Sequence, residues 1–104
     1  MFTHLEKGHD FLEHAPCGAA LSDAAAASGL SEFHFCRLFK ETYGETPAKF
    51  HRSALLDRAK CLLPKMSVSE VAEELGYNSV SAFVRAFRVG VGVTPGCYKK
   101  APSD

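Results

Sequence analysis

The chain contains one sequence pattern twice, and this duplication constrains the fold more than any other feature. Phe35 in the first copy and Phe83 in the second lie 48 residues apart, and the positions after them agree in register. The matched pairs are Phe35 and Phe83, Arg37 and Arg85, Phe39 and Phe87, Lys40 and Arg88, Gly44 and Gly92, Thr46 and Thr94, and Pro47 and Pro95. Aromatic and basic residues on a helical period, closed by a glycine, indicate one small helical unit used twice.

A short apolar helix pattern precedes each copy and ends at a glycine, Gly29 in the first and Gly76 in the second. The expected helix caps are Ser22, Ser31 and Ser67, the last of these with Glu70 in the spacing of a capping box. A helix, a tight glycine turn and a second helix that carries basic residues are typical of a helix-turn-helix unit.

A long helix is expected to join the two copies. Thr46 followed by Pro47 indicates a helix start, because proline is favoured at the first helical position after a threonine cap. Pro64 removes a backbone donor and disfavours helix at the residue before it, so this helix should end near Leu63. Its roughly 17 residues would form a rod about 25 Å long. The expected core stripe is Phe50, Ala54, Leu55 and Ala59 or Leu62.

Composition agrees with one mostly helical protein. The chain has 104 residues, of which 46% are hydrophobic, and no stretch alternates with period two for long enough to suggest a strand. We therefore predict an all-α fold of about seven helices, with two helix-turn-helix subdomains joined by a long linker helix. The predicted segments are an N-terminal helix and lead-in at 1–20 that packs on the first subdomain, the first helix-turn-helix at 21–46, the linker helix at 47–63, and the second helix-turn-helix with a C-terminal helix at 64–104.

Several motifs recur together in residues 21–99. They are Gly-Leu-Ser at 29–31 before Phe39-Lys40, Gly44-x-Thr-Pro, Leu75-Gly76-Tyr77-x-Ser79, and Phe83-x-Arg-x-Phe87 followed by Gly-Val-Thr-Pro-x-x-Tyr98. With these motifs the segment resembles the DNA-binding domain of the AraC/XylS family of bacterial transcription regulators. In that family two recognition helices enter adjacent major grooves. The resemblance implies a sequence-specific transcription regulator, an activator by analogy, with reading helices at about 32–43 and 80–89.

Helical geometry and the family's pattern together assign the outward residues of these helices. The residues predicted to read bases are Phe33, Cys36, Arg37, Ser81, Val84 and Arg85. The residues predicted to contact the DNA backbone are Ser31, His34, Lys40, Asn78, Ser79 and Arg88. Arg37 and Arg85 are the main base readers, because the arginine fork suits the two major-groove acceptors of guanine and each such contact discriminates by about 1–3 kcal/mol.

Each assignment has an alternative. An exposed arginine is usually a solvated charge, although the duplicated position favours DNA contact for Arg37 and Arg85. Aromatic residues at helical spacing are usually core, which is the interpretation adopted for Phe35, Phe39, Phe83 and Phe87. Phe33 has two interpretations, packing on the helix start or apolar contact with a thymine methyl group.

Charge supports a second hypothesis, from another class of function. The chain is formally neutral, whereas phosphate contacts normally dominate affinity for DNA. Its charges are unevenly spread, since residues 83–100 hold four basic residues and no acid. After Arg88 many family members continue with basic residues and an aromatic, but this chain has Val89-Gly90-Val91. The alternative is therefore a protein-interaction module of the same fold with weak or lost DNA binding.

Neither catalysis nor metal binding is expected. Nucleophile elbows, phosphate loops and paired catalytic carboxylates do not occur in the sequence, so we predict no enzyme activity and no cofactor. The four cysteines are scattered without a Cys-x-x-Cys motif. His4, His9 and His14 are spaced by five residues, which places successive side chains about 140° apart on a helix, so we predict no metal site.

The remaining expectations concern surroundings and extent. Without a secretion signal or a long apolar run, we expect a cytoplasmic, nucleoid-associated protein with no membrane contact. Double-stranded DNA is the expected partner and RNA polymerase a candidate second one, while no small-molecule effector site is evident. The apolar residues expected in the N-terminal helix are Phe2, Leu5, Phe11 and Leu12. Two interpretations of the chain stay open: a small stand-alone regulator that binds DNA as a monomer, which Met1 favours, or the end of a larger regulator.

Overall fold

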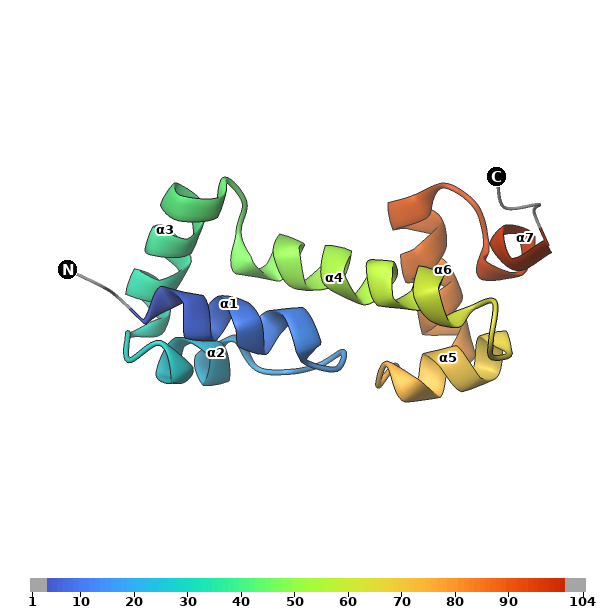
Figure 1. The fold of residues 1–104 in the computed structure, drawn as a ribbon, viewed down its shortest axis with the longest axis horizontal. Helices are drawn as coiled ribbons and strands as arrows, with labels where there is room; N and C mark the ends of the chain where they lie inside the picture. Colours follow the sequence, from blue (N-terminus) through green and yellow to red (C-terminus); the bar gives the residue numbers. More distant parts are fainter. Residues whose placement is uncertain (1–3, 101–104) are drawn as a thin grey trace. The chain divides into compact units, whose positions relative to one another are not determined.

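The computed structural model describes residues 4–100, and all regular structure in that range is helical (Figure 1). Its helices are α1 (Leu5–His14), α2 (Leu21–Ala27), α3 (Glu32–Tyr43), α4 (Pro47–Leu62), α5 (Val68–Glu74), α6 (Val80–Val91) and α7 (Pro95–Lys100). For residues 4–100, the prediction of an all-α fold with about seven helices is confirmed. The chain forms two compact units that divide inside α4, between Ala54 and Leu55. Phe2 lies outside the described residues.

Side chains near the helix starts satisfy backbone N–H groups that have no partner within the helix. Ser31 Oγ accepts a hydrogen bond from the backbone N–H of His34 at 3.2 Å, at the start of α3. The predicted capping box of α5 is present, because the hydroxyl of Ser67 accepts from the N–H of Glu70 at 3.1 Å while the Glu70 carboxylate accepts from the N–H of Ser67 at 2.9 Å. These bonds lower the pKa of the Glu70 carboxyl.

The expected cap at Ser22 is wrong. α2 begins at Leu21, with Ala20 as its cap residue and no side-chain hydrogen bond. Ser22 is therefore already inside the helix, where its backbone is helical and its hydroxyl cannot serve as the N-cap acceptor. The start of α2 is set instead by burial, since Ala24 and Ala25 pack into the first core with at most 2% of their surface exposed.

The first unit packs α1, α2 and α3 around one apolar core. Its buried residues are Leu5, Leu12, Ala24, Ala25, Phe35 and Phe39, with Phe11, Leu21, Leu30, Leu38 and Phe50 packed against them. The ring of His9 on α1 lies 4.4 Å from the ring of Tyr43 and 4.3 Å from the ring of Phe50, measured between centroids. α1 therefore contributes directly to the core on which the α3 helix rests.

Gly8 is the point of closest approach between α1 and the rest of the first unit. Its backbone N–H donates a 3.0 Å hydrogen bond to the hydroxyl of Ser28, which is buried at the end of α2. A methyl group at this position would overlap the Phe35 ring and the Ser28 hydroxyl, and would lie 2.8 Å from the carbonyl oxygen of Ala24. The glycine inside the α1 pattern is thus a packing requirement.

The second unit repeats the aromatic core of the first on α6. Phe83 and Phe87 are fully buried, with ring centroids 5.8 Å apart, as Phe35 and Phe39 are at 5.6 Å. Tyr98 of α7 closes this core with its ring 5.6 Å from that of Phe87. The remaining buried apolar side chains of the unit include Leu55, Ala59, Leu63, Val71, Ala72 and Leu75. The duplicated phenylalanines are therefore core residues, as predicted.

α6 extends two residues beyond its expected end at 89. It continues through Gly90 to Val91, and Gly92 ends it in the left-handed region with φ of 99°. A side chain at Gly90 would overlap Leu56 of α4, so this glycine lets the two helices approach each other. The Val-Gly-Val segment is consequently the last turn of a regular helix that is packed on α4.

We expect Gly8→Ala to destabilise the protein by about 1–3 kcal/mol, because the added methyl group overpacks the contact between α1, Ser28 and Phe35. At an open helical site the same change would stabilise by about 0.5–1 kcal/mol. Gly96→Ala in α7, where nothing lies within 4 Å of the added carbon, is the matched control. Urea unfolding followed by circular dichroism measures both variants, and a Gly8→Ala protein as stable as the parent would contradict this packing.

Candidate nucleic-acid interface

The outward face of α3 is set by its buried phenylalanines. Phe35 and Phe39 face the core, so the intervening residues are left on the surface. Phe33 is 72% exposed, so most of its ring faces solvent, and its edge contact is with the ring of His34 at 6.0 Å between centroids. The residues that line an open groove on this face are Phe33, Cys36, Arg37, Lys40, Glu41 and Thr46. Of the six predicted contact residues of the first unit, four line this groove, namely Phe33, Cys36, Arg37 and Lys40.

Two acidic residues modify the electrostatics of this face. Glu41 lies one helical turn after Arg37, with its Oε2 3.5 Å from the arginine Nε. Burial raises the pKa of the Cys36 thiol, and the nearby Glu32 carboxylate raises that pKa further. The thiol is therefore less ionised than an ordinary cysteine at neutral pH and behaves as a small apolar surface in the groove.

α6 presents a second open groove, which is formed in the same way as the groove on α3. Phe83 and Phe87 face inward, and the lining residues are Val80, Ser81, Val84, Arg85, Arg88, Val89 and Thr94. Four predicted contact residues, Ser81, Val84, Arg85 and Arg88, line it together. Val89 is 82% exposed and belongs to this surface, although the sequence reasoning did not assign it a role. The register of the duplication could have found it, because Val89 is equivalent to the groove residue Glu41.

The remaining predicted backbone contacts lie at the helix starts. Ser79 Oγ accepts from the N–H of Ala82 at 3.1 Å, and Ser31 Oγ similarly accepts from the N–H of His34. In both residues the hydroxyl oxygen is the capping acceptor, so the hydroxyl proton is what each can offer to a phosphate. Ser31 Oγ also lies 3.1 Å from His34 Nδ1, which would compete for that proton. Asn78 is exposed beside Ser79.

Lys99 is engaged within the second unit. Its Nζ donates hydrogen bonds to the carbonyl oxygens of Leu63 and Met66, at 2.7 and 2.5 Å. These carbonyls lie just beyond the end of α4, where a cation is favoured by the partial negative charge of the helix. Lys99 therefore stabilises the segment that follows α4. Of the other basic residues in 83–100, Arg85 and Arg88 line the groove.

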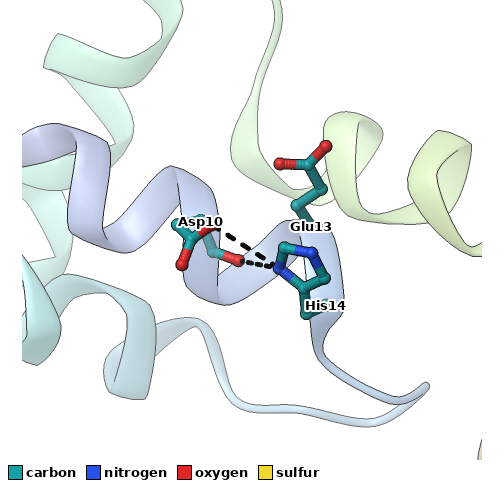
Figure 2. A group of neighbouring side chains, drawn as sticks. All are labelled: Asp10, Glu13 and His14. Atoms are coloured by element: carbon teal, nitrogen blue, oxygen red, sulfur yellow. Dashed lines mark hydrogen bonds and ion pairs between the residues drawn. The ribbon is translucent and has the colours of Figure 1, made fainter.

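One group of potential metal ligands among the described residues belongs to neither groove. Asp10, Glu13 and His14 on α1 have ligand atoms within 4.8 Å of one another, and all three are exposed (Figure 2). His14 Nδ1 lies 3.0 Å from the Asp10 carbonyl oxygen and 3.6 Å from its carboxylate, so contacts within the helix account for the orientation of the ring. Exposed acidic groups of this kind are common without a metal, and we assign no site here.

A family model described as a helix-turn-helix domain matches residues 24–101, which is more than half of the chain. The chain belongs to the AraC/XylS family of transcription regulators. Among its relatives in this family, the transcriptional activator NphR of a Rhodococcus species is 38% identical over 81 residues, which cover 77% of this chain and 24% of NphR. The probable transcription factor PqrA of Proteus vulgaris is 33% identical over 85 residues, covering 80% of this chain and 70% of PqrA.

Solved structures of the AraC/XylS family have the same fold. The DNA-binding domain of AdpA, described as a global transcriptional factor and solved in complex with a target DNA, superimposes with a TM-score of 0.82 at 28% identity. The match covers 95% of this chain and 91% of that one. By contrast, the chain spans only 27 to 59% of the length of the first curated relatives that it matches.

Within residues 4–100, no helix has the length and apolar character that crossing a bilayer requires.

We expect Lys99→Met to lower the free energy of unfolding by about 1–2 kcal/mol, because two charge-assisted hydrogen bonds to the end of α4 are lost. The salt dependence of DNA binding should not change, since this ammonium group is directed at carbonyl oxygens. Lys100→Met removes an exposed charge from the same helix and is the control for stability. Urea unfolding and binding titrations at several salt concentrations test both statements, and unchanged stability of Lys99→Met would contradict the capping role.

Proposed function

We propose that this chain is a sequence-specific, DNA-binding unit of a transcription regulator, in which each half places one reading helix in a major groove. The observation that carries the proposal is the repeated surface: α3 and α6 each bury two phenylalanines and expose an arginine between them in an open groove. The DNA-bound AdpA domain, with the same fold at 28% identity, supports it. We assign the two reading units to residues 21–46 and 64–104, joined by a linker at 47–63.

The residue types in the two grooves suit base reading. Arg37 and Arg85 can donate two hydrogen bonds to guanine, while Phe33 and Val84 offer apolar contacts to thymine methyl groups. The residues proposed for the DNA backbone are Ser31, His34, Lys40, Asn78, Ser79 and Arg88, which would fix the register of each helix without reading sequence. The remaining proposed base contacts, Cys36 and Ser81, lie in the grooves beside the arginines.

Wider aspects of the proposal rest on the family and on named relatives. The family consists of transcription regulators, so we propose that the chain has no enzyme activity and acts at the bacterial nucleoid in the cytoplasm. NphR is a transcriptional activator, which supports an activating role here, with RNA polymerase as a second partner. The relatives are mostly longer than this chain, so effector binding is assigned to no residue.

A second function is favoured by a specific observation on α6. Val89 is 82% and Val93 44% exposed, and the whole chain is formally neutral. Exposed apolar side chains near the groove suit a protein-interaction module that binds DNA weakly. The two functions differ in their response to salt, because counterion release makes DNA binding steeply salt-dependent and apolar protein contacts are much less affected.

The experiment that tests the proposed function is selection of duplexes from a random pool, followed by anisotropy titration of the selected duplex. We expect a site with two motifs about one helical turn, roughly 10 base pairs, apart. Its affinity should fall steeply between about 50 and 200 mM salt. Failure to enrich any sequence, together with a shallow salt response, would favour the protein-interaction module.

We expect Arg37→Ala and Arg85→Ala each to weaken binding to the selected duplex by about 1–3 kcal/mol more than binding to a scrambled duplex, because each removes a base contact. Lys7→Ala on α1 removes the same charge from an exposed position outside both grooves and should affect the two duplexes equally. Titrations of all three variants on both duplexes provide the measurement. An equal loss on the two duplexes would show that the arginine contacts only phosphate.

A further inference from the structure

The two reading helices differ in the residue that follows each groove arginine by one turn. On α3, Arg37 is followed by Glu41, whose Oε2 lies 3.5 Å from the arginine Nε with both side chains more than half exposed. On α6, Arg85 is followed by Val89, which is 82% exposed. The first arginine therefore has a carboxylate partner on its own helix, while the equivalent position on the second helix holds an apolar side chain that cannot form an ion pair.

The stability of α3 does not explain Glu41. It lies in the last turn of the helix, which ends at Tyr43, and an anion there is disfavoured by the negative end of the helix dipole. The order of the pair, base before acid, is also the less favourable one. Exposed pairs of this spacing contribute little to the stability of a helix. Glu41 does, however, line the same groove as Phe33 and Arg37, which points to a role at the surface that meets DNA.

We propose that Glu41 determines specificity by restraining Arg37, an inference that rests on the proposed DNA-binding function. The carboxylate engages the Nε edge of the guanidinium group. The two terminal amino groups are then the donors left for a base, and two parallel donors match the O6 and N7 acceptors of guanine. If Arg37 instead bound a phosphate, the Glu41 carboxylate paired with it would lie close to the negatively charged DNA backbone and would be repelled by it. Binding of Arg37 to unrelated DNA is thereby penalised.

The second reading helix differs from the first in its charged residues. Residues 75–100 contain no acidic residue, so Arg85 and Arg88 have no carboxylate on their own helix. We infer that α6 supplies most of the sequence-independent attraction to phosphate and that α3 supplies a larger share of the discrimination. Negative charge at the first groove thus weakens the unselective part of binding and leaves the base contact in place.

Removal of the carboxylate charge is the direct test. Glu41→Gln should bind a scrambled duplex about two- to fivefold more tightly at about 50 mM salt, because one repulsive charge near phosphate is removed. Affinity for the selected duplex should stay the same or fall, so the ratio of the two affinities decreases. Glu6→Gln on α1 makes the same change of charge at an exposed position outside the groove, and should leave the ratio unchanged.

A second arm shows whether the effect acts through the arginine. In an Arg37→Ala background, Glu41→Gln should change binding to the selected and scrambled duplexes by the same factor, because no guanidinium group is left to restrain. Urea unfolding of each variant confirms that the comparison is made between folded proteins.

The outcomes separate this inference from the proposed function. If the parent protein prefers its selected duplex and Glu41→Gln shifts both affinities equally, Glu41 has only a general charge effect and the inference is wrong. A decrease in the ratio that persists without Arg37 also overturns it. A parent protein that shows no sequence preference at all would overturn the proposed function, and this inference with it.

Discussion

The burial of two aromatic pairs, Phe35 with Phe39 and Phe83 with Phe87, is the constraint on which the reading surfaces depend. Residues four apart share one face of a helix, so burying both members of a pair fixes the rotation of the helix about its own axis. The arginine midway between them is then about 200° away from either ring and must face solvent. The position of each groove arginine is thus a consequence of core packing, independent of any contact that the arginine itself makes.

This dependence explains why much of the fold was predictable. Capping chemistry is a local property, and it predicted the Ser31 cap of α3, the capping box of α5 and the start of α4 at Pro47, whereas the family resemblance implied the bounds of α3. The prediction failed at Ser22, because burial of Ala24 and Ala25 outweighed the preference of serine for a cap. The reason for Gly8 in α1 could not be predicted from the sequence either. It depends on a contact with Ser28 that only the folded first unit creates.

Some properties of the outward residues could likewise be predicted from the sequence, and others could not. Helical geometry and the family's pattern together placed the predicted contact residues on exposed or half-exposed faces, although their binding roles remain predictions. Glu41 could have been found from its spacing to Arg37, whereas the role of Lys99 could not, because its carbonyl partners lie 36 and 33 residues away along the chain. Counting it as a surface charge overestimated the basic surface of the second unit. The sequence gives the charge of a side chain but does not show which group that side chain contacts in the folded protein.

The formal net charge of the whole chain therefore says little about the local charge of the surface that would face a DNA backbone. Charges more than about 10 Å apart are largely screened at moderate salt, so the local balance on each helix matters more than the total. On α3, Arg37 and Lys40 are offset by Glu32 and Glu41, whereas the two arginines of α6 have no acidic residue on their helix. The duplication has kept the buried residues of the two units alike while their outward charges differ. Because the core fixes the helices and the outward residues meet the ligand, this difference can change function without changing the fold.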